Sequence, residues 1–303
     1  MAGFHVVTIP SDRQGNMDLE QLYEACGPHL AGVMITLPST LGLFDPAIRE
    51  ICDRVHQAGG LVYGDGANMN ALLGHVKQGD LGFDVVHLNL HKTMSTPHGG
   101  GGPGAGPVCV SEQLIPFLPH PIVERQEDEY KFTRPIHSVG AMGAFHGNFG
   151  VLVRAYSYIR ALGARGLKQV CEDAVVNANY LRVNLKDEYD LPYDRSCMHE
   201  VVFSAKRQKV NGVRALDVAK RLIDYGIHPP TMYFPLIVEE ALMIEPTEAE
   251  SKETLDYFIE VMKKIAYEAQ TDPELLHEAP HFTPARRVDE AQAARHPDLR
   301  WKP

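Results

Sequence analysis

Residues 85–98 read VVHLNLHKTMSTPH, and residues 99–107 continue as GGGGPGAGP. The stretch begins with an almost continuous apolar run, which is typical of a strand covered on both faces of a parallel sheet. This predicted strand ends in Lys92, and a glycine-rich loop comes directly after it. Ligands of open α/β sheets bind at the carboxyl ends of the strands. A partly desolvated lysine amine at that edge is suited to Schiff-base formation with a carbonyl group.

Other motifs fit the same stretch less well. Gly99-x-Gly101-x-x-Gly104 has the spacing of a dinucleotide-binding loop, but that loop must open a helix, and Pro103 would interrupt such a helix. His87 and His91 have the helical spacing of zinc ligands, but they lie in a strand-like run without the glutamate of a His-Glu-x-x-His motif. We therefore expect neither NAD nor a metal. The glycines could also form a plain connector, but their position after the lysine favours close approach to a ligand or a neighbouring subunit.

The sequence before this stretch alternates between strand and helix signals. Residues 30–37 and 61–63 form apolar runs that are typical of buried strands, and residues 4–10 also read as a strand. Residues 45–59 between the two runs predict a helix with Asp as its cap and Gly at its end. This alternation predicts a mostly parallel α/β sheet.

An aspartate ends the predicted strand that precedes the lysine strand. In pyridoxal phosphate (PLP) enzymes, an aspartate keeps the ring nitrogen protonated, so that the ring can accept electrons from a bond broken at the substrate Cα. Asp65 alone would be interpreted as a turn residue of an Asp-Gly pair. An aspartate at one strand end and a lysine at the next together predict a PLP site built on Asp65 and Lys92.

The second half of the chain has a different pattern. Residues 148–186 look mainly helical, with breaks at Gly163 and Gly166. A compact α+β unit comes next, and its last helix is expected to open with the capping-box pattern Thr247-x-x-Glu250. We expect three parts: a partial PLP-binding large domain with connecting helices at 1–186, a small α+β domain at 187–270, and an extended tail at 271–303.

Composition excludes several classes of protein. The 303 residues suggest about two domains. The formal net charge is −10 without a basic block, so a nucleic-acid partner is not expected. The sequence has five cysteines without a Cys-x-x-Cys pair, no signal peptide pattern and no long apolar run, which predicts a cytoplasmic protein with reduced thiols and no membrane partner.

The lysine motif and its surroundings resemble a known family. Residues 89–93 (NLHKT) and 97–104 (PHGGGGPG) are similar to the cofactor-lysine motif of glycine dehydrogenase (decarboxylating), the P-protein of the glycine cleavage system. The chain most resembles subunit 2 of the two-subunit bacterial form. The further blocks that match the family are residues 40–44 (TLGLF), 65–71 (DGANMNA), 145–150 (FHGNFG), 198–200 (MHE) and 242–248 (LMIEPTE).

The resemblance implies a fold and a set of site residues. The fold would be the aminotransferase-like large domain of fold-type I PLP enzymes, with a smaller C-terminal α+β domain. Lys92 would carry the cofactor and act as the catalytic residue, Asp65 would pair with the pyridine nitrogen, and Ala67 would pack against the ring. His91 is the candidate phosphate or ring contact, and the resemblance implies Asn89 and Thr93 as further cofactor contacts.

The resemblance also implies a reaction and partners. Glycine would lose its carboxylate as carbon dioxide, and its aminomethyl group would pass to the lipoyl arm of the H-protein. Subunit 1 would complete a hetero-tetramer with two copies of each subunit. Members of the family carry a long N-terminal part that this sequence lacks, so we expect the isolated chain to bind the cofactor weakly and to have impaired activity.

Two alternatives remain open. Another fold-type I enzyme, such as a cysteine desulfurase or an aminotransferase, would use the same aspartate and lysine. A desulfurase would need a cysteine on a loop, whereas Cys109 and Cys197 lie in or beside strand-like segments. The second alternative is a noncatalytic assembly subunit, and the presence of both Asp65 and Lys92 speaks against it.

Overall fold

The computed structural model describes residues 3–98, 104–143 and 146–300. Two compact units divide the chain: unit 1 comprises residues 1–176 and 196–199, and unit 2 comprises residues 177–195 and 200–303. No helix among the described residues combines the length and the hydropathy that a membrane crossing needs. The domain limits expected from the sequence stay a prediction.

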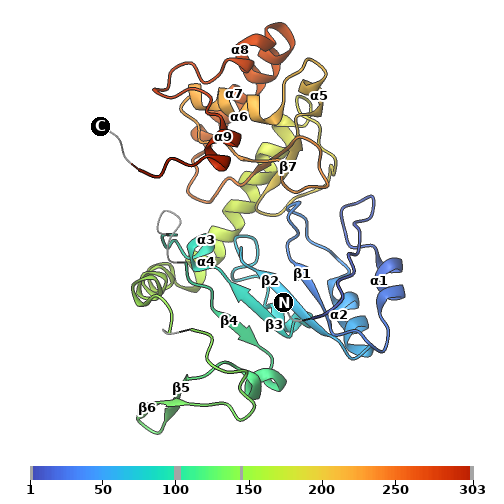
Figure 1. Cartoon of the computed structure of the whole chain (residues 1–303), viewed down its shortest axis with the longest axis vertical. Coiled ribbons are helices and arrows are strands. Elements are labelled where there is room, and N and C mark those ends of the chain that lie inside the picture. The colour runs from blue at the N-terminus through green and yellow to red at the C-terminus, as the bar shows by residue number, and fades with distance from the viewer. Residues whose placement is uncertain (1–2, 99–103, 144–145, 301–303) are drawn as a thin grey trace. The chain divides into compact units, whose positions relative to one another are not determined.

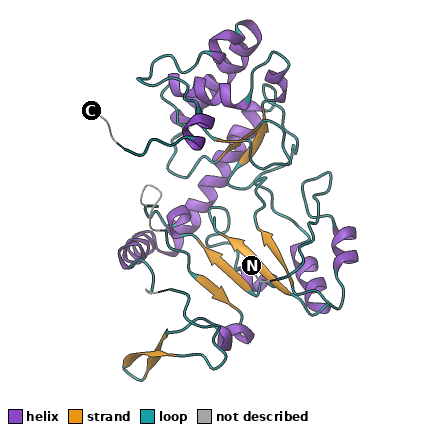
Figure 2. Cartoon of the chain, in the orientation of Figure 1, coloured by secondary structure: helices purple, strands orange, loops and turns teal. Residues whose placement is uncertain are grey.

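Unit 1 is an α/β unit built on a four-stranded sheet (Figures 1 and 2). Its elements, in chain order, are α1 (Leu19–Ala25), β1 (Gly32–Thr36), α2 (Ile48–Gln57), β2 (Leu61–Gly66), η1 (Gln78–Leu81), β3 (Val85–Leu88), α3 (Leu90–Thr93), β4 (Val108–Val110), η2 (Glu112–Phe117), β5 (Ile122–Gln126), β6 (Glu129–Thr133) and the first part of α4 (Phe149–Leu185). The strand order is β1-β2-β3-β4, with β1, β2 and β3 parallel and β4 antiparallel to β3. The prediction of a mostly parallel sheet is therefore confirmed.

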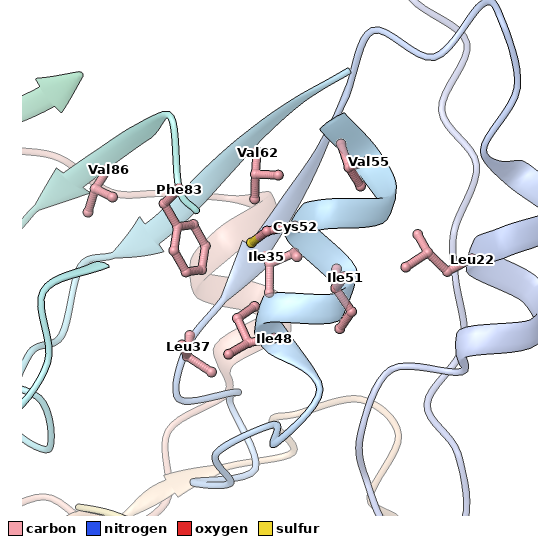
Figure 3. Close-up of a cluster of buried hydrophobic side chains, with 10 residues drawn as sticks. All are labelled: Leu22, Ile35, Leu37, Ile48, Ile51, Cys52, Val55, Val62, Phe83 and Val86. Atoms are coloured by element: carbon pink, nitrogen blue, oxygen red, sulfur yellow. The ribbon is translucent and has the colours of Figure 1, made fainter. Parts of the chain in front are cut away.

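Helix α2 covers one face of this sheet. Its apolar residues recur at helical spacing, and Ile51, Cys52 and Val55 are completely buried. They pack against Val62 of β2 and against Phe83, which precedes β3 (Figure 3). This core holds β2 and β3 in place, and it thereby positions the residues at their carboxyl ends.

The opposite face of the sheet carries the polar side chains. Along β2, Val62 and Gly64 are buried whereas Tyr63 and Asp65 on the other face are partly exposed. Met34 of β1 pairs with Tyr63 and therefore lies on that same face, where it is 71% exposed. Asp65 is thus on the accessible face of the sheet.

Three local predictions in unit 1 are wrong. Residues 4–10 form no strand, because they find no ladder partner among the described residues. Helix α2 begins at Ile48, because the Asp45 carboxylate accepts a hydrogen bond from Ala47 N–H and closes a turn before the helix. Strand β3 ends at Leu88, so Lys92 lies on the short helix α3 and not at the end of the strand.

A buried carboxylate, Asp84, fixes the amino-terminal end of the sheet. Its side chain is 6% exposed and accepts hydrogen bonds from Val62 N–H at 2.8 Å and from the Gln113 amide at 2.9 Å. The ring nitrogen Nε2 of His56 lies 2.8 Å from the same carboxylate. Burial alone would raise the pKa of Asp84, but these hydrogen bonds outweigh burial and lower the pKa below its usual value.

We expect Asp84 to make the stability of unit 1 sensitive to acid. Because the pKa is lower in the folded than in the unfolded state, its contribution is complete above the usual value of about 3.9 and is lost as the pH falls through the folded pKa. In urea unfolding, Asp84→Asn is expected to cost about 1–3 kcal/mol at neutral pH, and this difference is expected to shrink in acid. A difference between the two proteins that stays constant with pH would contradict this account.

The hairpin of β5 and β6 is amphipathic. Val123 pairs with Phe132, and Arg125 pairs with Tyr130, so these four side chains share one face of the hairpin. The other face carries mostly polar pairs such as Glu124 with Lys131. Val123, Tyr130 and Phe132 are each more than half exposed. The hairpin therefore presents an apolar face to its surroundings.

Helix α4 passes from unit 1 into unit 2. Gly163 has φ 62° and ψ −177°, which interrupts the helix at the first of the two predicted breaks. A left-handed φ of this kind favours glycine, which has no Cβ. The second predicted break, at Gly166, does not occur.

Unit 2 is a small α+β unit. Its elements after α4 are β7 (Val201–Ser204), α5 (Lys206–Lys209), α6 (Ala215–Asp224), β8 (Thr231–Met232), β9 (Ala241–Ile244), α7 (Lys252–Thr271), α8 (Pro273–His277) and α9 (Glu290–Arg295). The antiparallel sheet has the order β7-β9-β8. The segment expected to be an extended tail carries α8 and α9, and the backbone N–H groups of His281 and Phe282 donate to Asp224.

The predicted start of the last long helix needs correction. Helix α7 begins at Lys252, and Ser251 is its N-cap, since the Ser251 hydroxyl accepts a hydrogen bond from Thr254 N–H at 3.2 Å. Thr247 instead closes a turn in which Glu250 N–H donates to its carbonyl oxygen. The apolar stripe of the helix, which includes Leu255, is buried as predicted.

Candidate active site

The candidate site lies at the carboxyl ends of β2 and β3. Asp65 of β2 is in register with His87 of β3, and the two side chains share the accessible face of the sheet. The Asp65 Oδ1 atom accepts a hydrogen bond from Ala67 N–H at 3.0 Å. Ala67, the expected ring contact, is 9% exposed. The predicted acid therefore stands at the sheet edge where α/β proteins bind ligands.

Lys92 lies nearby on the short helix α3. The apolar neighbours Leu90 and Met94 are buried and pack against Val151 and Ala155 of α4. This packing anchors the helix, while the Lys92 side chain remains exposed. Among the described residues, the Lys92 amine makes no hydrogen bond or ion pair, so it is available to react with a carbonyl group.

Two hydrogen bonds join the aspartate segment to the lysine segment. Asn89 N–H donates to the Ala67 carbonyl at 3.3 Å, and Met69 N–H donates to the Thr93 hydroxyl at 2.8 Å. Asn89 is the N-cap residue of α3, so the first bond ties the start of that helix to the end of β2. The structure thus brings the backbone around Asp65 beside the helix that carries Lys92.

His91 is partly buried beside the glycine-rich loop. Burial lowers its pKa, and the neighbouring His98 and Lys92 lower the pKa further, which favours the neutral ring. The His91 and His98 rings meet edge to face with 4.1 Å between their centroids. The buried Nδ1 atom of His91 has no hydrogen-bond partner in the described part of the chain. Such an orphaned atom is suited to meet a polar group of a bound ligand.

The glycine-rich loop approaches α3 closely. A Cβ atom at Gly104 would lie only 3.2 Å from the His91 ring, and one at Gly106 would lie 3.4 Å from the Leu88 carbonyl oxygen. The Asn148 amide donates to the Gly104 carbonyl at 2.7 Å and holds this part of the loop. At Gly104 the close contact is made within the chain, and the predicted approach to a ligand or a neighbouring subunit stays a prediction. The preceding glycines at 99–102 lie outside the described residues.

Sequence reasoning missed several residues around the site. Tyr63 Oη lies 2.7 Å from His87 Nδ1, and His87 Nε2 lies 3.4 Å from Asp65 Oδ1. Two side chains of the following segment also donate to backbone carbonyls near the site. Asn148 donates to the Gly104 carbonyl, and the Arg154 guanidinium donates to the Ser95 carbonyl at 2.8 Å. The alternation of side chains along β2 and β3 was the available signal for Tyr63 and His87.

Two alternative interpretations lose support at these positions. His87 and His91 do not form a pair of ligands, since the His87 ring contacts Tyr63 whereas the His91 ring contacts His98. Cys109, which a desulfurase would need on a loop, lies within strand β4. Cys197 is buried.

Curated relatives match nearly the whole chain. A probable glycine dehydrogenase (decarboxylating) subunit 2 from Caldanaerobacter subterraneus subsp. tengcongensis is 59% identical over 99% of this chain and 62% of its own length. A protein with the same name from Desulforamulus reducens is 56% identical over 100% of this chain and 63% of its own length. The family model of the glycine dehydrogenase C-terminal domain matches residues 170–281.

Solved structures share the fold. A glycine decarboxylase (P-protein) of the glycine cleavage system, in inhibitor-bound form, has a TM-score of 0.72 at 20% identity and covers 87% of this chain and 60% of that one. An apo cysteine desulfurase from Thermococcus onnurineus NA1 has a TM-score of 0.65 at 20% identity, covering 86% of this chain and 66% of that one. The predicted fold-type I architecture is confirmed. By sequence, the chain is similar over nearly its whole length to proteins named probable glycine dehydrogenase (decarboxylating) subunit 2, and it spans about 62% of the length of these relatives.

Proposed function

We propose that this chain carries the PLP-binding lysine and the ring-nitrogen carboxylate of a glycine-decarboxylating enzyme of the glycine cleavage system. The observation that carries the proposal is the pair of hydrogen bonds that join the Asp65 segment to the Lys92 helix at the carboxyl edge of parallel strands. The names of the curated relatives support glycine as the substrate.

The residues at this edge fit PLP. The exposed Lys92 amine is matched to the aldehyde, the Asp65 carboxylate to a protonated ring nitrogen, and the orphaned His91 Nδ1 to a polar substituent of the ring or to the phosphate. Asn89 and Thr93 are proposed as further contacts. The Thr93 hydroxyl oxygen already accepts a hydrogen bond from Met69 N–H, so Thr93 would contact the cofactor by donating its hydroxyl hydrogen.

When bound, PLP supplies an electron sink for the pair of electrons left when glycine loses carbon dioxide. Lys92 would hold the cofactor covalently and release it to the substrate amine. Asp65 would accept a hydrogen bond from the ring nitrogen and stabilise its positive charge, which keeps the ring able to withdraw electrons. Ala67, which has only a methyl side chain, would leave room for the flat ring to lie against the backbone.

Chemical mapping of the cofactor site tests this proposal. The purified chain would be mixed with PLP, reduced with borohydride, digested and analysed by mass spectrometry. We expect the label on the peptide that contains Lys92, even if binding to the isolated chain is weak. A label that is spread over the exposed lysines, such as Lys168 and Lys252, without preference for Lys92 would contradict the proposal.

We also propose that the chain works in an assembly. The relatives are named subunit 2, and the exposed apolar face of the β5–β6 hairpin is the kind of surface that partners cover. The partners would be subunit 1, in a hetero-tetramer with two copies of each, and the lipoylated H-protein. Mass measurement in solution with and without subunit 1 tests the assembly, and an unchanged mass on mixing would contradict it.

Glycine-bicarbonate carbon exchange separates an enzyme from a noncatalytic subunit. With subunit 1 and H-protein present, we expect exchange that depends on this chain and on PLP. A complex that forms without any exchange would instead identify a noncatalytic assembly subunit. We place these reactions in the cytoplasm, and the five free cysteines support this proposal because reducing compartments keep thiols unpaired.

A further inference from the structure

Three polar side chains form a chain of contacts across the accessible face of the sheet. Tyr63 and Asp65 lie on the same face of β2, two residues apart, and His87 stands opposite Asp65 on β3. The Tyr63 hydroxyl is 2.7 Å from His87 Nδ1. His87 Nε2 is 3.4 Å from Asp65 Oδ1. The imidazole therefore stands between a phenol and the carboxylate.

The hydrogen-bonding capacities of these groups select one arrangement. A neutral imidazole has one N–H donor and one acceptor nitrogen. If Nδ1 accepts a hydrogen bond from the Tyr63 hydroxyl, the hydrogen of the neutral ring lies on Nε2 and faces the carboxylate. The reverse tautomer would direct the lone pair of Nε2 at an anionic oxygen, which is unfavourable. Asp65 thus favours the Nε2–H tautomer of His87, and the Tyr63 hydroxyl stabilises this tautomer by donating to Nδ1.

Both contacts of Asp65 act on the same oxygen atom. Ala67 N–H donates to Oδ1 at 3.0 Å, and His87 Nε2 approaches Oδ1 as well. Within the described chain, Oδ2 has no hydrogen-bond donor. One oxygen is therefore held by the protein, and the other remains available for a ligand.

We propose that His87 and Tyr63 are positioning residues that hold the Asp65 carboxylate so that Oδ2 can receive the ring nitrogen of the cofactor. This inference rests on the proposed function, because it assigns a role toward PLP. Neither residue needs to touch the cofactor. At metal sites, residues that hydrogen-bond to a metal ligand without touching the metal orient that ligand and change the affinity for the metal. We expect His87 and Tyr63 to act on Asp65 in the same way.

The tautomer of His87 can be measured without cofactor. Two-dimensional long-range ¹H–¹⁵N spectra of the chain distinguish a ring hydrogen on Nδ1 from one on Nε2. We expect the Nε2–H form in the wild type and a mixture in Tyr63→Phe, where the hydroxyl is absent. The proposal would be overturned if the ring hydrogen of His87 lies on Nδ1 in the wild type. It would also be overturned if the tautomer populations of His87 are the same in the wild type and in Tyr63→Phe.

Cofactor affinity supplies the second measurement. Loss of one hydrogen bond changes an equilibrium by about fivefold, so Tyr63→Phe is expected to weaken PLP binding by about that factor. His87→Phe removes the ring nitrogen that lies 3.4 Å from Asp65 Oδ1 and is expected to weaken binding by about tenfold. His87→Gln carries an amide N–H at a similar reach and is expected to stay within about twofold of the wild type.

Tyr23→Phe provides a matched control. Tyr23 donates to Glu50 on the α1–α2 side of unit 1, so this variant also loses one tyrosine hydroxyl hydrogen bond but does so away from the site. We expect its PLP affinity to equal that of the wild type. Equal losses in Tyr63→Phe and Tyr23→Phe, or no recovery in His87→Gln relative to His87→Phe, would show a merely structural role. If the wild type binds no PLP, the proposed function fails for this chain, and the tautomer measurement still decides whether His87 is directed at Asp65.

Discussion

The Lys92→Ala chain is expected to form no borohydride-stable product with PLP at position 92, and its complex with subunit 1 is expected to show no glycine-bicarbonate exchange above background. The physical reason is that the methyl group of alanine cannot form the covalent bond through which Lys92 would hold the cofactor. The amine of Lys92 is exposed and makes no ion pair in the described chain, so its removal leaves no buried partner behind. The substitution should therefore abolish the exchange reaction and leave the free energy of unfolding nearly unchanged.

Asp65→Ala is expected to behave differently from Lys92→Ala. The product at Lys92 should still form, because the amine is intact. Exchange should fall by about 10²–10³-fold, the usual cost of removing one preorganised group that stabilises charge in the transition state. This difference between the two variants distinguishes Lys92, which would attach the cofactor, from Asp65, which would stabilise the positive charge on the ring nitrogen.

Matched controls are available in the same unit. Lys168 is an exposed lysine of α4, and Asp53 is an exposed acid of α2 away from the candidate site. Lys168→Ala and Asp53→Ala should keep both the product at Lys92 and the exchange rate. If Lys92→Ala retains exchange, or if Asp65→Ala exchanges at the wild-type rate, the assigned roles are wrong.

Arg221→Met is expected to destabilise unit 2 by about 3–5 kcal/mol. The Arg221 guanidinium donates to the two Glu268 oxygens at 2.9 and 3.0 Å and to Asp224 at 3.1 Å. The side chains of Arg221 and Glu268 are only 9% and 11% exposed. These hydrogen bonds, above all those to Glu268, raise the pKa of Arg221. Methionine would fill similar space and leave the Glu268 carboxylate buried without its cation.

A double variant separates the cost of the orphaned charge from the loss of packing. If the unpaired carboxylate is the main cost, Arg221→Met combined with Glu268→Leu should be more stable than Arg221→Met alone. Lys252→Met breaks an exposed pair with Asp256 and should leave the free energy of unfolding nearly unchanged. Urea unfolding measures all three proteins. A double variant that is less stable than the single one would contradict this explanation.

Local patterns in the sequence were sufficient for the elements that bury one face. The apolar stripe of α2 and the apolar runs of β1 and β2 arise from side-chain periodicity, which depends only on neighbours along the chain. The break at Gly163 was likewise visible, because a left-handed φ selects glycine. Element ends were less certain, as Ser251 and Ile48 show, because capping groups several residues apart compete for the same backbone N–H groups.

The sequence by itself determined the residue types of the candidate site: an acid at the end of one strand, a lysine after the next, and glycines that let a loop come close. Only the tertiary structure decided which side chains stand beside that acid. Tyr63 meets His87, and Arg221 meets Glu268, across 24 and 47 residues of sequence. Such pairs are set by strand register and by helix packing, and a shift of one residue along β3 would turn His87 to the opposite face. Periodicity along a chain specifies which face a residue occupies, whereas its partner on that face depends on how distant segments align.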